Sequence, residues 1–440
     1  MVMSESVIIN EDGNLEIGGC DLVKLAQQYD TPLNILDEEH IRNKCRKYRR
    51  ILEQYYPTTE LAYAGKAFLS TTICKIVEEE GLFLDVVSEG ELFTAVQAGF
   101  PGDKLLFHGN NKTSRELEYA LDCNVGRIVV DSFLELELIE KLAQKKSTRV
   151  QIYFRVKPGI EAHTHKYILT GQEDSKFGFS LRQDDIMKAV NFAIKSSYID
   201  LQGLHCHIGS QINESKPYRL AAKTMMELLI SIQKIYNYSI SELDLGGGMG
   251  IKYRSDDSKL DIDSLMNEIS QLILDMAKDS KIELPKLIFE PGRSIIGEAG
   301  VMLYRVGVIK EIPGIRNYVS VDGGMSDNIR PALYGAEYSA VVANKANYPH
   351  NNSYTVVGKI CESGDVLLQN IDLVDNLTPG DLLTVFSCGA YTYSMSSNYN
   401  RLPKPAVVLV NQGQADLIVR RESLEDVIQN DLIPERFRRN

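Results

Sequence analysis

From about residue 38 to 300, short apolar runs alternate with longer segments in which apolar residues recur three and four positions apart. The short runs are typical of strands buried on both faces, and the longer segments of helices with one buried face. Eight strands and their intervening helices, preceded by one more helix, predict an eight-stranded parallel (β/α)8 barrel of the TIM type. A doubly wound open sheet is the alternative, but it normally has fewer strands. The predicted strands span residues 60–66, 82–88, 105–110, 127–132, 151–157, 201–208, 242–246 and 286–290, and the helices 38–55, 70–80, 90–99, 114–122, 134–146, 182–196, 216–237 and 261–279.

Both ends of the chain have strand character. Beyond residue 301 the helical period disappears, and apolar runs are separated by Gly, Pro and Asn turns. The N-terminus predicts a hairpin turning at Asp12-Gly13, a helix at 21–29 and an extended segment at 31–36. An isolated hairpin is not stable alone, so we expect residues 1–37 and 301–440 to form an appended all-β domain, in addition to a barrel domain of residues 38–300. Its expected later strands are Val301–Glu311, Tyr318–Val321, Tyr354–Ile360, Leu382–Phe386, Ala406–Val410 and Asp416–Val419, with a mobile polar loop at 345–353.

Composition narrows the possible partners. A length of 440 residues fits two domains, and the net charge of −12 without an extended Lys/Arg cluster argues against nucleic acid or an acidic membrane as a partner. No apolar run reaches the length of a membrane span, and residues 1–20 lack the features of a signal peptide. Seven cysteines, an odd number without a CxxC pair, indicate a reducing, cytoplasmic setting.

Lys66 ends the first predicted strand, and in such barrels the chemistry collects at the C-terminal strand ends. A lysine buried there has a lowered pKa, and its neutral amine can condense with an aldehyde. The alternative is a lysine whose ammonium group reaches solvent. The loop at 158–180 is also long enough to be functional. The predicted strand ends together carry Lys66, Asp85 with Ser88, His108 with Asn110 and Asn111, Arg155, His205 and His207, Gly246–Gly248, and Glu290.

The last two strand ends favour a phosphate-bearing aldehyde as cofactor. The glycines at 246–248 allow backbone N–H groups to converge on a phosphate, although a flexible turn is the alternative. Glu290 ends the eighth strand, which pairs with the strand of Lys66 in a closed barrel; a salt bridge with Arg293 is its alternative role. An aldehyde for the lysine, a ring nitrogen for the carboxylate and a phosphate for the glycines are the parts of pyridoxal 5'-phosphate. His205 and His207 share one face of their strand, so one could stack on the ring; they lack a third ligand nearby, and we expect no metal.

Nine motifs resemble one family of enzymes. YAGKAF, HGNNK, TGQEDSKFGFS, HCHIGSQ, DLGGGMG, EPGRS, RPALY, CESGD and GAYTYSMSSNYN follow one another between about residues 30 and 420. They are similar, in the same order, to the motifs of the diaminopimelate decarboxylases, fold-type III enzymes that use pyridoxal phosphate. The resemblance implies a barrel with an appended β domain, decarboxylation of meso-2,6-diaminopimelate to L-lysine and carbon dioxide, and a homodimer whose subunits share active sites.

The resemblance also implies a role for each matching position. Catalysis would depend on Lys66, carrying the cofactor as an internal aldimine, on His207 and Glu290, and on Cys361 as proton donor. The cofactor would be bound by Lys66, Asp85, His207 (stacked on the ring), Ser210, Gly246, Gly247, Gly248, Glu290 (at the pyridine nitrogen), Gly292, Arg293 and Tyr391. The amino-acid substrate would be bound by Arg293, Arg330, Tyr334, Glu362 and Tyr391.

Two other functions are weighed against this one. A decarboxylase of ornithine, lysine or arginine would share the cofactor, but its substrate has a distal cation and favours acidic residues where Arg330 lies. A non-catalytic cofactor-binding protein is the second alternative, against which the β domain with Cys361 and Tyr391 speaks. Cys361 could also be a small core residue, the usual fate of a free cysteine, but its polar neighbours argue for the catalytic role.

Overall fold

The computed structural model describes residues 6–160, 174–181 and 184–438, so residues 161–173 of the predicted functional loop lie outside the described residues. The chain divides into two compact units. The barrel unit comprises Ile41–Lys252 and Asp257–Gly297, and the β-rich unit comprises Met1–His40, Tyr253–Asp256 and Glu298–Asn440. The boundaries between the units along the sequence therefore lie near residues 40 and 297. The short segment at 253–256 belongs to the β-rich unit, although the residues on both sides of it belong to the barrel unit.

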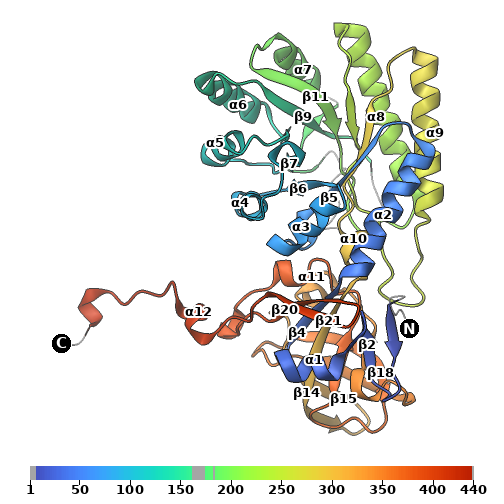
Figure 1. Cartoon of the computed structure of the whole chain (residues 1–440), viewed down its shortest axis with the longest axis vertical. Coiled ribbons are helices and arrows are strands. Elements are labelled where there is room, and N and C mark those ends of the chain that lie inside the picture. Colours follow the sequence, from blue (N-terminus) through green and yellow to red (C-terminus); the bar gives the residue numbers. More distant parts are fainter. Residues whose placement is uncertain (1–5, 161–173, 182–183, 439–440) are drawn as a thin grey trace. The chain divides into compact units, whose positions relative to one another are not determined.

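The barrel unit contains eight parallel strands that close on themselves. Figure 1 labels several of these strands and the helices that lie outside them. β13 pairs with β5, as predicted for the first and last strands, and β8 pairs with β9 to complete the ring. The closed barrel is thus confirmed, and the open sheet is excluded. Its strands are β5 (Thr59–Ala64), β6 (Phe83–Val86), β7 (Leu105–Phe107), β8 (Arg127–Val130), β9 (Val150–Lys157), β11 (Ile199–His205), β12 (Glu242–Asp244) and β13 (Lys286–Phe289), and β10 (Phe179–Ser180) adds to β9.

Helices follow the strands because polar caps start them close to each strand end. The side chains of Ser70, Ser88, Thr113 and Ser132 each accept a hydrogen bond from the third residue of the helix that follows. Ser88, which the sequence places among the chemical groups of the rim, is therefore a helix cap. The helices are α2 (Glu38–Tyr55), α3 (Thr71–Glu79), α4 (Glu89–Gln97), α5 (Ser114–Asp122), α6 (Phe133–Lys146), α7 (Asp185–Lys195), α8 (Ser215–Tyr236), α9 (Ile262–Ser280) and the single turn α10 (Arg293–Ile296). Among the described residues, no helix has the length and apolar character that crossing a bilayer requires.

The β-rich unit is built on a nine-stranded sheet in which N- and C-terminal segments pair directly. β4 (Leu33–Asp37) pairs antiparallel with β14 (Gly300–Ile312) and parallel with β20 (Ala406–Asn411). The predicted hairpin forms a separate small sheet of β1 (Val7–Ile9), β2 (Leu15–Ile17) and β3 (Cys20–Asp21). The remaining elements are α1 (Leu22–Tyr29), β15 (Arg316–Val321), α11 (Arg330–Tyr334), β16 (Ala340–Val342), β17 (His350–Val357), β18 (Val366–Val374), β19 (Leu382–Val385), β21 (Gln414–Val419) and α12 (Leu424–Ile428).

The appended β domain is confirmed, with the predicted helix at 21–29 present as α1. Two expectations for this unit are wrong. β17 begins at His350, inside the predicted loop 345–353, because β18 supplies a partner for its polar first half. β18 is missed by the sequence pattern because a break in the pairing register and the left-handed φ of 50° at Asn370 interrupt its alternation.

An ion-pair cluster joins four strands of the barrel, since Nζ of Lys286 on β13 also lies 3.4 Å from Oε1 of Glu242. The carboxylate of Glu242 receives two hydrogen bonds from Arg127, at 2.8 and 3.0 Å, and one from the hydroxyl of Tyr153. Glu242 is 6% exposed. Burial raises the pKa of its carboxyl, but the bonds from Arg127 and Tyr153 outweigh burial and lower that pKa below its usual value. The cluster therefore stabilises the barrel as long as Glu242 is ionised.

Replacement of this carboxylate should destabilise the protein. Glu242→Gln should lower the free energy of unfolding at pH 7 by about 2 kcal/mol, because the half-buried guanidinium of Arg127 loses its two charge-assisted hydrogen bonds. Urea unfolding measures this. Since the folded pKa is depressed, the contribution is complete above the ordinary glutamate pKa of about 4.3 and is lost as pH falls through the folded value. The difference between wild type and variant should therefore shrink on acidification.

Glu118→Gln is the matched control, because Glu118 forms an exposed ion pair with Lys145. Loss of such a pair costs less than about 1 kcal/mol. Equal effects of the two substitutions at pH 7 would show that the buried cluster does not support the barrel.

Candidate functional site

Lys66 lies on a single 3-10 turn, η1 (Gly65–Ala67), which begins directly after β5. The expectation that the strand itself ends on this lysine is therefore wrong by two residues. The turn comes close to β6: a Cβ atom on Gly65 would lie 2.8 Å from the carbonyl oxygen of Asp85, so only glycine fits there. The Lys66 side chain is 38% exposed, less buried than the sequence predicts, and its Nζ lies 3.8 Å from Oδ2 of Asp85. The amine is thus open to a ligand at the barrel rim.

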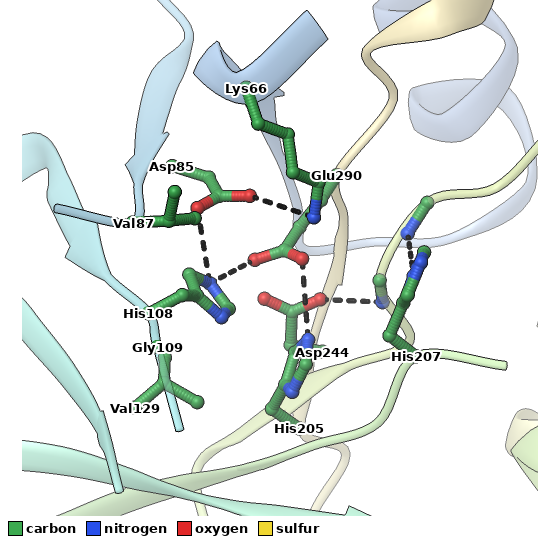
Figure 2. A network of polar contacts seen from close by, with 12 residues as sticks. Lys66, Asp85, Val87, His108, Gly109, Val129, His205, His207, Asp244 and Glu290 are labelled. Carbon is green, nitrogen blue, oxygen red and sulfur yellow. Dashed lines mark hydrogen bonds and ion pairs between the residues drawn. The ribbon is translucent and has the colours of Figure 1, made fainter. Parts of the chain in front are cut away.

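Glu290 follows β13 and places its carboxylate between two imidazoles (Figure 2). Nε2 of His108 lies 2.7 Å from Oε1, and Nε2 of His205 lies 3.3 Å from Oε2. All three side chains are buried. The predicted alternative, a salt bridge with Arg293, is not what the structure contains: Arg293 donates to the hydroxyl of Ser210 at 2.9 Å. His205, for which the sequence leaves a plain core role open, is a direct partner of Glu290.

Two further carboxyl groups share this interior. Asp85 and Asp244 are fully buried, and burial raises the pKa of both. The pKa of Glu290 is driven in the opposite direction: burial raises it, but His108 and His205 outweigh burial and bring it well below its usual value. A single ionised carboxylate is therefore favoured at Glu290, with Asp244 kept in its neutral form beside it.

His207 lies just beyond β11 and faces the glycine run. The N–H of Gly247 donates to its Nδ1 at 3.3 Å. Burial lowers the pKa of His207 well below its usual value, with the charges of Lys66 and Arg155 adding to the effect. The imidazole is therefore neutral, as a ring that stacks on another aromatic ring should be.

The run Gly246–Gly248 forms a crowded backbone cradle. Gly246 and Gly248 have left-handed φ values of 66° and 99°. A Cβ atom on Gly246, Gly247 or Gly248 would lie only 2.6, 2.0 or 2.2 Å from the carbonyl oxygens of Cys206, Glu290 and Gly209, respectively. Gly292 is similarly confined, since its Cβ would lie 2.9 Å from that of Ala64. No side chain fits at these positions, so glycine is required for the close approach of the neighbouring backbone segments.

The barrel site fits pyridoxal phosphate. The buried carboxylate of Glu290, whose pKa is held low, is the type of group that keeps the ring nitrogen of the cofactor protonated. The Lys66 side chain is exposed enough to reach an aldehyde, and the glycine run presents backbone without side chains, as phosphate-binding loops do. Lys66, Glu290 and the cradle thus match the three reactive parts of the cofactor.

A second lysine in the barrel is a structural group. Nζ of Lys112 donates to the carbonyl oxygens of Gly109 and Val129, at 2.8 and 2.7 Å, and to Glu135 at 2.7 Å. All three hydrogens of the ammonium are used, and its side chain is 2% exposed. Lys112 therefore cannot serve as the cofactor lysine without breaking this network.

Three predicted substrate and cofactor residues come together in the β-rich unit. Arg330 is buried at the start of α11, where Nε donates to the hydroxyl of Tyr338 at 2.7 Å. Its guanidinium lies 5.5 Å from the ring of Tyr334, and Tyr391 is near enough to act on its charge. Tyr391 has a left-handed φ of 58°, a strained conformation for a bulky residue. A cavity of about 890 Å³ opens beside α11 and is lined by Pro331, Ala332, Gly335 and Tyr338, among others.

Cys361 and Glu362 lie on a different loop of this unit, after β17, and both are exposed. The N–H of Cys361 donates to Oδ1 of Asn400 at 2.8 Å, and the hydroxyl of Tyr399 donates to Glu362 at 3.0 Å. The thiol is therefore not a core residue, and the alternative of a buried structural cysteine is wrong for Cys361. The loop containing Asn400 fixes its position.

The triad of His108, His205 and Glu290 also offers donor types that bind metals, with its ligand atoms within 4.8 Å of one another. The separation of 2.7 Å between His108 and Glu290 is that of a hydrogen-bonded pair. It is shorter than the roughly 3.4 Å expected between two ligands of a tetrahedral zinc ion. The geometry favours a polar network over a metal centre.

The sequence pattern predicts that one rim of the barrel carries Lys66, Asp85, His207, Glu290 and the glycine run. It assigned no role to His108 or Asp244, although both lie at predicted strand ends. The signal that could have identified them is their position opposite Glu290 in a closed barrel, which requires the register of the strands.

Comparison with known proteins agrees with this site. The family described as "Pyridoxal-dependent decarboxylase, pyridoxal binding domain" matches residues 38–297. The diaminopimelate decarboxylase of Bacillus subtilis (strain 168) is 47% identical over 423 residues, which cover 96% of each chain. That of Staphylococcus aureus (strain COL) is 45% identical over 97% of this chain and 99% of its own. A crystal structure of diaminopimelate decarboxylase from M. jannaschii in complex with L-lysine has a TM-score of 0.93 at 33% identity, covering 99% of this chain and 100% of its own.

The matches extend over both units and include the barrel residues that fit pyridoxal phosphate. The chain belongs to the diaminopimelate decarboxylase family of pyridoxal-phosphate-dependent decarboxylases.

Proposed function

We propose that this chain converts meso-2,6-diaminopimelate to L-lysine and carbon dioxide. The main support is that the accessible amine of Lys66 lies at the same barrel rim as the buried, ionised carboxylate of Glu290. This arrangement occurs in a chain that is 47% identical to a diaminopimelate decarboxylase over 96% of its length. The seven cysteines all lie in the described ranges and form no disulfide, which supports a reducing, cytoplasmic setting.

Bound pyridoxal phosphate supplies an electron sink for the electron pair left when the substrate loses carbon dioxide. Lys66 attaches the cofactor through its amine, and Glu290 keeps the ring nitrogen protonated. His207, neutral and half-buried, stacks on the ring, while Asp85 lies within 3.8 Å of the amine of Lys66 and orients it. Gly246–Gly248, Gly292, Arg293 and Ser210 hold the phosphate end.

The β-rich unit selects the substrate and returns the proton. Arg330, with Arg293 and Tyr334, binds the carboxylate at the end of the substrate that does not react, because guanidinium groups pair well with carboxylates. Cys361 delivers a proton to the α carbon, and Glu362 and Tyr391 hold the reacting end of the substrate. The proposed working unit is a homodimer in which the two chains share their active sites by two-fold pairing.

Arg330 supports this function over its main alternative. A decarboxylase of ornithine, lysine or arginine needs acidic groups for the distal cation of its substrate. Arg330 is instead a buried cation among the aromatic rings of Tyr253, Tyr334 and Tyr338. A distal carboxylate is the complementary substrate group.

The first prediction concerns the cofactor lysine. Borohydride reduction of the yellow holoenzyme should fix the cofactor to the peptide that contains Lys66, because this amine is exposed at the rim. Peptide mass spectrometry measures the site, and Lys66→Ala should abolish fixation. Lys112 is an internal comparison, because it lies in the same barrel with its three donors occupied. Recovery of the label on any other lysine peptide would overturn the assignment.

The second prediction concerns substrate selection. Arg330→Ala should lower kcat/KM for diaminopimelate by roughly 10- to 150-fold, the effect of losing a charge-assisted contact worth about 1.5–3 kcal/mol. Release of carbon dioxide measures activity, with ornithine as the competing substrate. Wild type should prefer diaminopimelate.

Two variants control for the burial of Arg330. Arg330→Lys keeps a charge but loses the paired N–H groups, so it should remain impaired. Tyr338→Phe removes the hydroxyl that fixes Arg330 but keeps the cation, so it should lose less activity than Arg330→Ala. Full diaminopimelate turnover in a folded Arg330→Ala variant would show that the distal carboxylate binds elsewhere.

The third prediction tests shared sites by complementation. Lys66→Ala and Cys361→Ala should each be nearly inactive, and the mixed subunits should exchange. Random pairing makes half of the dimers mixed, each with one intact site of two, so about a quarter of wild-type activity should return. If each site is built from a single chain, mixing will restore no activity, and the shared-site proposal will fail.

A further inference from the structure

His108 lies within 4 Å of the carboxyl groups of both Asp85 and Glu290. The catalytic, cofactor-binding and substrate-binding roles proposed above do not include it. It follows β7, and its Nε2 lies 2.7 Å from Oε1 of Glu290 and 3.8 Å from Oδ1 of Asp85 (Figure 2). Asp85 in turn lies 3.8 Å from Nζ of Lys66 through its other oxygen. The side chains of Lys66, Asp85, His108 and Glu290 thus form a continuous polar chain across the barrel rim.

The position of His108 is fixed by its backbone. Its N–H donates to the carbonyl oxygen of Val86 at 2.8 Å. The next residue, Gly109, has a positive φ of 123°, and its carbonyl oxygen accepts from the ammonium of Lys112. The imidazole is 4% exposed and packs edge-on against the ring of His205, with centroids 4.8 Å apart. The ring therefore has little freedom to leave the two carboxylates.

The groups facing His108 make it the bridge of the network. β6 contributes Asp85, the end of β13 contributes Glu290, β11 contributes His205 and β12 contributes Asp244, while Lys66 and Arg155 supply the nearby positive charges. His205 contacts only Oε2 of Glu290, at 3.3 Å. Among the described residues, only the imidazole of His108 has a nitrogen within 4 Å of both Asp85 and Glu290.

We propose that His108 is a positioning residue that bridges Asp85 and Glu290, holding one carboxylate for the ring nitrogen of pyridoxal phosphate and the other for the amine of Lys66. The inference rests on the roles proposed for Lys66 and Glu290. Its N–H favours the ionised carboxylate of Glu290, so that the ring nitrogen keeps its proton. Through Asp85, the same imidazole links the two ends of the cofactor.

Three substitutions separate the N–H donor from the volume of the ring. His108→Gln places an amide N–H near the position of Nε2, His108→Leu has a similar size without a donor, and His108→Asn has a donor that is too short to reach. Two readouts need no substrate: the dissociation constant of pyridoxal phosphate added to cofactor-free protein, and the pH dependence of the visible absorbance of the bound cofactor.

Loss of the bridging donor should weaken cofactor binding by about 10- to 100-fold in His108→Leu and His108→Asn, the range of a lost charge-assisted hydrogen bond. Glu290 should then take up its proton at higher pH, so the acidic limb of the absorbance titration should move to higher pH. His108→Gln should stay within about threefold of wild type and keep its titration. Urea unfolding identifies any variant that fails to fold; if His108→Leu does so, His108→Asn supplies the same test.

Wild-type affinity and titration in folded His108→Leu or His108→Asn would overturn the proposal. An equal loss in His108→Gln would overturn it as well, because a retained donor would then make no difference. A wild-type enzyme that releases no carbon dioxide from diaminopimelate would refute the proposed function, whereas the order of the three variants in cofactor affinity would still decide the role of His108.

Discussion

The site depends on keeping one carboxylate ionised inside a protein barrel. Removal of a carboxylate from water costs several kcal/mol unless partners replace the lost hydration. Glu290 is 4% exposed and has an imidazole at each oxygen, from β7 and from β11. These two strands approach the same carboxylate only because the sheet closes on itself, so the protonation state of Glu290 depends on the closure of the barrel.

The same closure explains the glycines around the site. β12 and β13 bring the run Gly246–Gly248 against the backbone of Glu290, with the N–H of Glu290 donating to Gly246 at 2.8 Å. A methyl group on Gly247 would lie 2.0 Å from the carbonyl oxygen of Glu290. Glycine is therefore required for the close packing of the segments that follow the two strands.

The sequence predicted the parts of the site that depend on local pattern. Lys66, Asp85 and Glu290 lie near the ends of apolar runs, and their order along the chain is enough to place them on one rim. His108 and Asp244 were not assigned roles, because their chemistry depends on the register of the strands. The register determines which side chains lie opposite one another across the barrel. The degree of burial was also mispredicted for Lys66, since a 3-10 turn of three residues after β5 lifts the side chain toward the rim. In the β-rich unit, the break in β18 at Asn370 hides a strand whose stability comes from its pairing with β17.

The two units solve different physical problems. In the barrel unit, Glu290 is buried and has an imidazole at each oxygen, so its electrostatic balance is set before a ligand arrives. Cys361 and Glu362 are exposed, and their partners Asn400 and Tyr399 are exposed as well. Water competes for the thiol and the carboxylate in such positions, so neither group is held as firmly as Glu290. A donor of this kind becomes selective only when a ligand or another protein surface covers it. The free energy that orders Cys361 and Glu362 must therefore come from binding, whereas the free energy that orders Glu290 comes from folding.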